Sequence, residues 1–206
     1  MCPLLETAYW PPVSWLSVLW PCATAAIEAC EHYQKGSWRN RCHIAGPNGV
    51  QRLSVPLEKG KHRQMAIREV RIAYDEPWRQ QHWRSIRTAY GNAPFFEHYE
   101  LELAHFYEKR HTFLFDLNLD LLQFLLRKTA WPGQIALSQT FYAKDAWPHG
   151  TDYRGALPVS EDQYPDWFAP LPYPQVFAEK HGFVANLSGL DLLMCAGKKS
   201  GLLLTK

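Results

Sequence analysis

A four-residue turn between two strand-like segments places the strongest constraint on how this chain folds. Residues 46–49 read Gly-Pro-Asn-Gly, and both Asn48 and Gly49 tolerate a positive φ. An Asn-Gly pair is typical of the tight turns that connect antiparallel strands. The sequence therefore predicts a hairpin whose strands cover about Arg39–Ala45 and Val50–Val55.

The opening of the chain predicts a second, different kind of β-structure. Leu4–Trp10 reads as a short strand, Pro11 and Pro12 close it and start a helix that runs to Leu19, and Ala25–Ala29 reads as another strand. Strand, helix and strand at this spacing are typical of an α/β sheet. Alternating or apolar residues predict further strands over Ile67–Ala73 and Ile135–Tyr142.

The middle of the chain is predicted to be helical. Three helices are expected at about Trp78–Tyr90, Phe95–Lys109 and Thr112–Thr129, and the third is apolar around most of its circumference, which predicts burial. Residues 145–172 are rich in proline and aspartate and predict a long irregular loop. A last helix is expected over Leu187–Cys195, with Asn186 or Ser188 as its cap. We predict an α/β fold in a single domain over residues 1–206, with a mixed β-sheet, flanking helices and a helical middle segment.

Composition supports a folded, water-soluble chain. With 206 residues, 47% of them hydrophobic, and nine tryptophans, the chain has ample material for one core. The cysteine count of five is odd and lacks a Cys-x-x-Cys pair, which predicts free thiols rather than disulfides or a Cys-rich zinc site. The sequence shows neither a signal peptide nor the ~20 consecutive apolar residues of a membrane span. We therefore expect a cytoplasmic protein.

Positive charge is concentrated in one part of the chain. The net charge is only +2, but residues 35–87 contain 12 Lys and Arg against 4 Asp and Glu. A basic middle with acidic flanks favours an anionic small molecule as partner, whereas long nucleic acid usually needs a broader basic face. We expect a nucleotide sugar or another phosphate, and no nucleic acid. The oligomeric state is left open.

The candidate anion site lies just before the Gly-Pro-Asn-Gly turn signal of the predicted hairpin. Five polar or cationic side chains form it: Gln34, Lys35, Arg39, Asn40 and Arg41. If this segment is a strand, Arg39 and Arg41 share one face and can hold a phosphate or carboxylate in the bidentate geometry that guanidinium groups favour. The alternative is an ordinary solvated strand face.

Several histidines and one tyrosine are candidates for chemistry or binding. His62 lies on a basic, glycine-containing loop and is our candidate general acid or base, the alternative being an exposed loop histidine. His82 and Tyr90 are candidate substrate contacts, but their helical spacing also suits core positions. His98, His105 and His111 do not have the spacing of a metal motif, so no metal is predicted. Asp152 and Arg154 lie in the irregular loop and suggest a lid.

An ordered set of motifs resembles the WbqC-like protein family. The motifs are Tyr9-x-Pro11, Tyr33-Gln34, Arg39-Asn40-Arg41, Asn48-Gly49, Val55-Pro56, His62, His82-Trp83, Tyr90, Pro94-Phe95-Phe96 and Gly182-Phe183-x-x-Asn186-Leu187-Ser188-x-x-Asp191-Leu192-Leu193. The resemblance covers about Leu4 to Leu193 and implies a bacterial cytoplasmic protein. It also implies a link to O-antigen-type polysaccharide biosynthesis, but it assigns no catalytic residues. Many relatives carry an adjacent acidic pair where this chain has Glu28 and Glu31 separated by two residues.

Two functions follow as hypotheses. The first is a transferase of bacterial glycan biosynthesis, in which Lys35, Arg39 and Arg41 bind the anion, His62 acts as base, and Glu28 or Glu31 orients a hydroxyl or amine. The second is a non-catalytic binding or assembly protein that uses the same groove. The chain has no Walker loop, dinucleotide fingerprint or nucleophile elbow, so no cofactor is expected.

Overall fold

The computed structural model describes residues 1–59, 65–159 and 165–204. A three-stranded parallel sheet contains β1 (Leu4–Leu5), β2 (Thr24–Ile27) and β5 (Gln134–Leu137), in the order β1-β2-β5. The register pairs Leu5 with Ile27 and Ile27 with Leu137. The strand–helix–strand order of the opening is as predicted, with α1 (Val13–Leu19) between β1 and β2. The strands are shorter than predicted: β1 ends at Leu5 and not at Trp10, β2 at Ile27 and not at Ala29, and β5 at Leu137 and not at Tyr142.

A loop segment extends this sheet beyond β1. Asp152 forms a parallel bridge with Leu4, in which the Leu4 amide donates to the Thr151 carbonyl and the Tyr153 amide donates to the Leu4 carbonyl. The segment lies in the region that the sequence predicted to be irregular, and the described residues between β5 and α5 (Ala178–His181) form neither a helix nor a named strand. This loop therefore reaches the same sheet edge as the first strand.

The predicted hairpin is confirmed and forms a separate two-stranded antiparallel sheet. Its strands are β3 (Arg41–Gly46) and β4 (Gly49–Ser54), and Gly46 pairs with Gly49 across the turn. Gly49 has a φ of +106°, the conformation that the Asn-Gly pair was expected to supply. The α/β fold class is confirmed, with parallel and antiparallel strands in two sheets.

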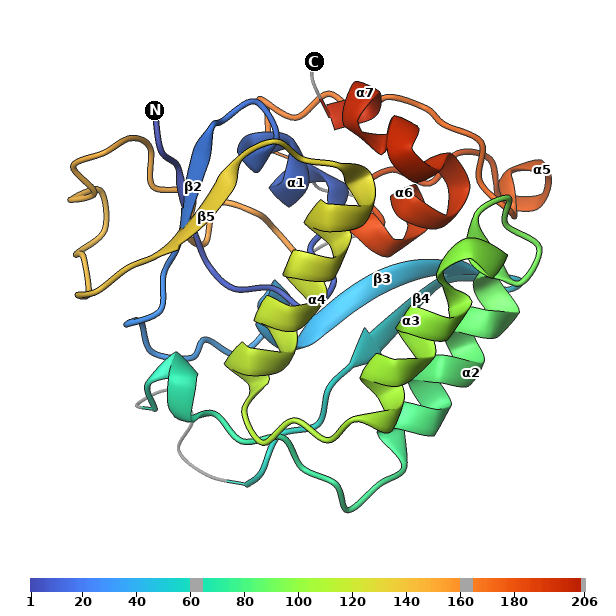
Figure 1. The fold of residues 1–206 in the computed structure, drawn as a ribbon, viewed down its shortest axis with the longest axis horizontal. Helices are drawn as coiled ribbons and strands as arrows, with labels where there is room; N and C mark the ends of the chain where they lie inside the picture. The colour runs from blue at the N-terminus through green and yellow to red at the C-terminus, as the bar shows by residue number, and fades with distance from the viewer. Residues whose placement is uncertain (60–64, 160–164, 205–206) are drawn as a thin grey trace.

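The helical middle of the chain is also confirmed. Its helices are α2 (Trp78–Tyr90), α3 (Phe96–Glu108) and α4 (Leu114–Thr129). Figure 1 shows α4 in the middle of the molecule, with α2 and α3 beside the hairpin and the parallel sheet on the opposite side. Leu121, Phe124 and Leu125 of α4 are buried in the core, which agrees with the predicted burial of this helix.

The C-terminal part packs against α1 and α4. It consists of α5, α6 (Gly189–Ala196), the 3₁₀ turn η4 (Gly197–Lys199) and α7 (Ser200–Leu204). Ser188 occupies the N-cap of α6 without a side-chain cap bond, whereas the Asn186 side chain accepts from the Ser14 amide at 2.8 Å. Asn186 therefore satisfies an amide in the first turn of α1 rather than one in the last predicted helix.

The strand predicted over Ile67–Ala73 is wrong. Residues Ile67–Glu69 form a 3₁₀ helix, η3, and only single bridges follow, from Arg71 to Phe113 and from Ile72 to Leu57. Ile67, Val70 and Ile72 are all buried. The 3₁₀ turn brings residues three apart onto one side, so Ile67 and Val70 face the core together without an alternating strand.

No helix within residues 1–59, 65–159 and 165–204 is long and apolar enough to cross a bilayer.

Candidate functional site

Charged side chains gather at the carboxyl edge of the parallel sheet. Glu6 directly follows β1, Glu28 directly follows β2 and Ser138 directly follows β5, while the bridge at Asp152 brings Arg154 to the same edge. The carboxyl ends of parallel strands meet at one edge, and this is where open α/β sheets bind their ligands. The topology therefore brings together residues that are more than 140 positions apart in the chain.

Glu28 is sealed beneath this edge and fully bonded. Its carboxylate Oε1 accepts from the Cys30 amide at 2.8 Å and from the Ser138 hydroxyl at 2.5 Å. Its Oε2 accepts from Arg154 Nη1 at 2.9 Å. The side chain is completely buried, so its charge is compensated by Arg154 rather than by water.

Arg154 is fixed by several acceptors at once. Besides Glu28, it donates from Nε to Asp152 Oδ1 at 2.9 Å, from Nη2 to Asp152 Oδ2 at 2.6 Å, and from Nη2 to the Tyr142 carbonyl at 2.9 Å. Burial opposes ionisation of Asp152, but the bonds from Arg154 outweigh it and hold the pKa of this carboxyl below its usual value. The sequence suggested a lid here, whereas the structure anchors Arg154 to the sheet.

Glu31 forms a second buried pair with Arg39. Arg39 donates from Nε to Glu31 Oε1 at 2.8 Å and from Nη2 to Glu31 Oε2 at 2.5 Å. Burial raises the pKa of Glu31; Arg39 opposes the shift, and the nearby charges of Glu6 and Glu28 add to it. Glu6 is itself buried, which raises its pKa, and its Oε2 accepts from the Gly155 amide at 2.8 Å. Two guanidinium groups thus compensate the carboxylate cluster of Glu6, Glu28, Glu31 and Asp152.

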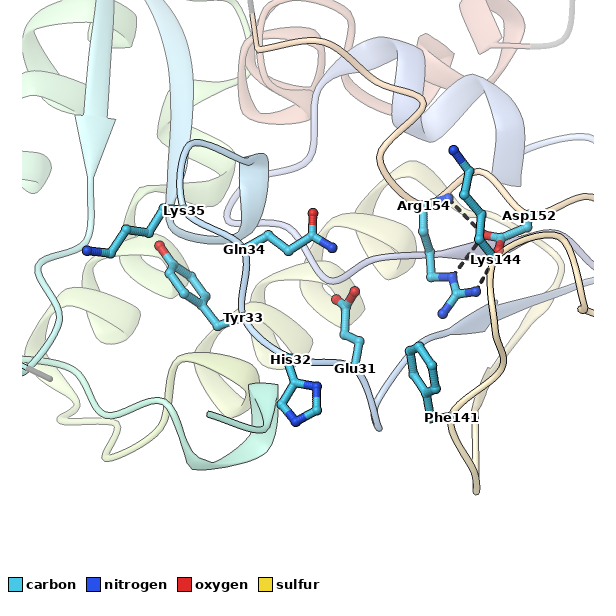
Figure 2. Close-up of a pocket in the computed structure, with 9 residues that line it drawn as sticks. All are labelled: Glu31, His32, Tyr33, Gln34, Lys35, Phe141, Lys144, Asp152 and Arg154. Carbon is cyan, nitrogen blue, oxygen red and sulfur yellow. Dashed lines mark hydrogen bonds and ion pairs between the residues drawn. The ribbon is translucent and has the colours of Figure 1, made fainter. Parts of the chain in front are cut away.

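A cavity of about 510 Å³ opens in front of these two pairs. Its lining residues come from segment 31–35 and from the loop after β5: Glu31, His32, Tyr33, Gln34, Lys35, Phe141, Lys144, Asp152 and Arg154. Figure 2 shows Glu31 pointing into the space between Gln34 on one side and Phe141 and Arg154 on the other. Lys35 lies at the opposite end from Lys144, and neither lysine forms an ion pair with a described residue. The cavity therefore offers positive charge at both ends and a buried carboxylate between them.

Three of the predicted site residues line this cavity, and two lie directly behind it. Glu31, Gln34 and Lys35 are at its surface. Glu28 and Arg39 hold Arg154 and Glu31, respectively, from the interior.

The predicted placement of Arg39 and Arg41 on one strand face is wrong. Trp38–Asn40 is a 3₁₀ helix, η1, whose N-cap Ser37 accepts from the Arg39 amide, and β3 begins only at Arg41. Arg39 is 1% exposed because its guanidinium compensates the buried Glu31. Arg41 pairs with Ser54 at the end of the hairpin, and Asn40 donates from Nδ2 to the Val55 carbonyl at 2.9 Å. Neither side chain lines the cavity.

His82 and Tyr90 lie in the core, away from the lining of the cavity. His82 Nδ1 is hydrogen-bonded to the Tyr9 hydroxyl at 2.9 Å, and burial lowers the pKa of His82 to about 4. Tyr90 is completely buried close to Asp191, and burial raises its pKa far above the usual value. Both residues therefore occupy core positions, which their helical spacing also allowed.

His62 lies outside the described residues, and a different histidine lines the cavity. His32, Tyr33, Phe141 and Lys144 were not among the predicted site residues, yet all four are at the cavity surface. One signal was present: Phe141 lies at the end of the strand predicted over Ile135–Tyr142, and Lys144 comes just after it. Among the described residues, no group of three or more His, Cys, Asp or Glu side chains is arranged to hold a metal ion.

The fold and this site define an α/β protein with a charged cavity at the carboxyl edge of a parallel sheet. The chain belongs to the WbqC-like protein family, whose family model matches residues 7–147. The match includes Glu28, Glu31 and Lys144 and ends before Arg154.

A curated relative is similar over part of the chain. "Uncharacterized protein Rv1507c" of Mycobacterium tuberculosis is 39% identical over 92 residues, which is 44% of this chain and 39% of the relative. The matched segment thus spans well under half of the length of that protein. No solved structure matches the chain.

Proposed function

We propose that this protein is a transferase of bacterial glycan biosynthesis that binds a nucleotide-linked or otherwise phosphorylated substrate in the cavity between segment 31–35 and the loop after β5. One observation carries the proposal: Lys35, Lys144 and Arg154 surround a buried carboxylate, Glu31, at the carboxyl edge of the parallel sheet. The glycan context of the proposal comes from what the resemblance to the WbqC-like family implies.

Anion binding falls to the two lysines. Arg154 is already held by Asp152 and Glu28, whereas the ammonium groups of Lys35 and Lys144 are exposed. A lysine binds phosphate as a point charge and adapts to it through its flexible stem. Arg154 keeps a fixed position on the cavity wall, where Asp152 and Glu28 compensate its charge, so the free cations of the cavity are the two lysines.

Glu31 is the group proposed to act on the acceptor. Arg39 holds the Glu31 carboxylate in one orientation. The raised pKa of Glu31 makes this carboxylate a better proton acceptor than an exposed glutamate. In the transfer, the acceptor oxygen or nitrogen forms a bond to the transferred group and the bond from that group to phosphate breaks. The acceptor proton passes to Glu31 or to the predicted base His62, and the cationic side chains stabilise the charge left on the phosphate.

A specific observation favours a second candidate, a non-catalytic ligand-binding or assembly protein. Both oxygens of Glu31 already accept from Arg39, and Glu28 is sealed from the cavity. A carboxylate bonded in this way can position a ligand without taking its proton. This candidate predicts binding in the same cavity without turnover.

Calorimetric titration with nucleotide sugars, nucleoside diphosphates and sugar phosphates tests the binding step. We expect Lys35→Ala/Lys144→Ala to weaken the binding of an anionic ligand by about tenfold or more, because the free cations at both ends of the cavity are removed. Lys198→Ala/Lys199→Ala removes the same charge from two exposed positions outside the cavity and should leave affinity unchanged. Equal affinity in the wild type and the cavity variant would contradict the proposal.

Turnover separates the two candidates. For a ligand that binds, release of the nucleotide or phosphate is followed in the presence of hydroxyl and amine acceptors, in the wild type and in Glu31→Gln and His62→Ala. Release that falls in either variant, with binding retained, supports the transferase. Binding without release in the wild type supports the binding protein.

A further inference from the structure

Phe141 is an unusually exposed aromatic side chain on the cavity wall. It is 59% exposed, and it is the one lining residue of this cavity among the exposed large hydrophobic side chains of the described chain, the others being Met1, Leu101, Trp167 and Leu202. Burial of a phenylalanine is favourable, so an exposed ring inside a polar cavity leaves a surface that a ligand can cover.

One side of the Phe141 ring is already occupied by a fixed cation. The guanidinium carbon of Arg154 lies 5.5 Å from the ring centroid, and Arg154 is held in place by Glu28, Asp152 and the Tyr142 carbonyl. Figure 2 shows the ring beside the guanidinium at the edge of the cavity. The ring is therefore supported from one side and accessible from the other.

Negative charge on the ligand can be met by Lys144 at the same end of the cavity, although Figure 2 shows its ammonium beyond Arg154 and not next to the ring. Lys144 follows Phe141 by three residues in the same loop, and Figure 2 shows both at the same end of the cavity. The accessible face of an aromatic side chain can stack with a planar heteroaromatic group, as nucleobases do on phenylalanine rings. A planar base next to a phosphate is the chemistry of a nucleotide.

We propose that Phe141, supported by Arg154, is the stacking platform for the nucleobase of a nucleotide-linked substrate, with the adjoining phosphates at Lys144. This inference rests on the proposed function and narrows its substrate class from any phosphorylated compound to a nucleotide. The group linked to the nucleotide then extends toward Glu31 and Gln34, which face the middle of the cavity.

The test compares ligands with and without a base. Calorimetric titration uses the full chain with ADP, CDP, GDP, UDP and dTDP, and with pyrophosphate as the base-free probe. We expect Phe141→Ala to weaken the binding of the tightest-binding nucleoside diphosphate by at least about fivefold, since base–aromatic stacking contributes ~1–3 kcal/mol. The affinity for pyrophosphate should remain unchanged. Phe141→Trp should retain the affinity, and the exposed aliphatic control Leu101→Ala should behave as wild type.

Three results would overturn the inference. In the first, Phe141→Ala leaves nucleotide affinity unchanged. In the second, Phe141→Ala weakens pyrophosphate binding as much as nucleotide binding. In the third, the wild type binds pyrophosphate as tightly as it binds every nucleotide. In each of these cases a loss of binding in Lys35→Ala/Lys144→Ala still supports the proposed function. Absence of binding by any anionic ligand, or binding that this double variant does not affect, overturns the proposed function as well.

Discussion

At the residue scale, the buried pair of Glu31 and Arg39 connects the stability of the protein to its site. The two bonds of 2.8 and 2.5 Å are made by side chains that are almost completely shielded from water. Removal of one partner leaves the other as an unpaired buried charge, which is far more costly than loss of the pair. The same geometry orients Glu31 toward the cavity, so the pair serves folding and ligand positioning together.

A double-mutant cycle tests this pair. We expect Arg39→Met to lower the free energy of unfolding by about 3–5 kcal/mol, because Glu31 is left uncompensated. Glu31→Leu/Arg39→Met should recover much of that loss. Urea denaturation of the two single variants and the double variant provides the measurement, and a cost below about 1 kcal/mol for Arg39→Met would contradict the role assigned to the pair.

Asp191 is a second buried carboxylate at this scale, and it makes stability depend on pH. Its Oδ1 accepts from the Tyr173 hydroxyl at 2.8 Å and from Gln175 Nε2 at 3.3 Å. Burial raises the pKa of Asp191 from 3.8 to about 6. Because the folded pKa lies above the unfolded value, this group contributes stability below pH 3.8 that is lost as pH rises through 6.

Asp191→Asn should remove this dependence. The amide oxygen can still accept both bonds, while the cost of the buried charge at neutral pH disappears. We expect the unfolding free energy of the variant, relative to wild type, to rise between pH 4 and pH 7 by up to about 3 kcal/mol. Denaturation curves at several pH values provide the test, and a difference that is flat or falls with pH would refute it.

At the element scale, the close approach of α1, α4 and α6 depends on one glycine. A Cβ at Gly189 would lie 2.5 Å from Leu16 Cδ1 and 2.6 Å from Leu125 Cδ2, and the Gly189 amide donates to the Pro11 carbonyl at 2.7 Å. Leu16 belongs to α1 and Leu125 to α4, so a larger residue at the start of α6 pushes against both helices.

We expect Gly189→Ala to destabilise the protein by about 1–3 kcal/mol through overpacking. Gly46 is the matched control, since a Cβ there meets its closest neighbouring atom at an ordinary 3.5 Å. Thermal unfolding of both variants is the measurement. Equal stability in Gly189→Ala and Gly46→Ala would show that the three helices can separate without cost.

Local patterns predicted most elements, but not the short or irregular ones. The hairpin, α2, α3 and α4 follow from turn chemistry and apolar spacing. The segment after Ala66 was predicted as an alternating strand, which would place Ile67 and Val70 on opposite faces, whereas the 3₁₀ helix allows Ile67, Val70 and Ile72 all to be buried. Only tertiary packing against α4 decides between them.

At the scale of the whole molecule, the site depends on contacts that no local pattern contains. The sequence predicted Glu28, Glu31, Gln34 and Lys35 as site residues, and these four lie close together in the chain. It could not pair Glu28 with Arg154, 126 residues later, because that contact requires the parallel order of β1, β2 and β5 and the bridge at Asp152. The sequence also predicted that Arg39 lies on an accessible strand face. Arg39 is instead buried, because its guanidinium compensates the charge of the buried Glu31.

A crystal structure of the protein with the nucleoside diphosphate that binds most tightly would locate the ligand directly. We expect electron density in the cavity at the carboxyl edge of the parallel sheet, with the base stacked on Phe141 and a phosphate within hydrogen-bond distance of Lys144. A ligand that occupies a different surface, such as the outer face of α2 and α3, while this cavity holds none, would contradict the central claim.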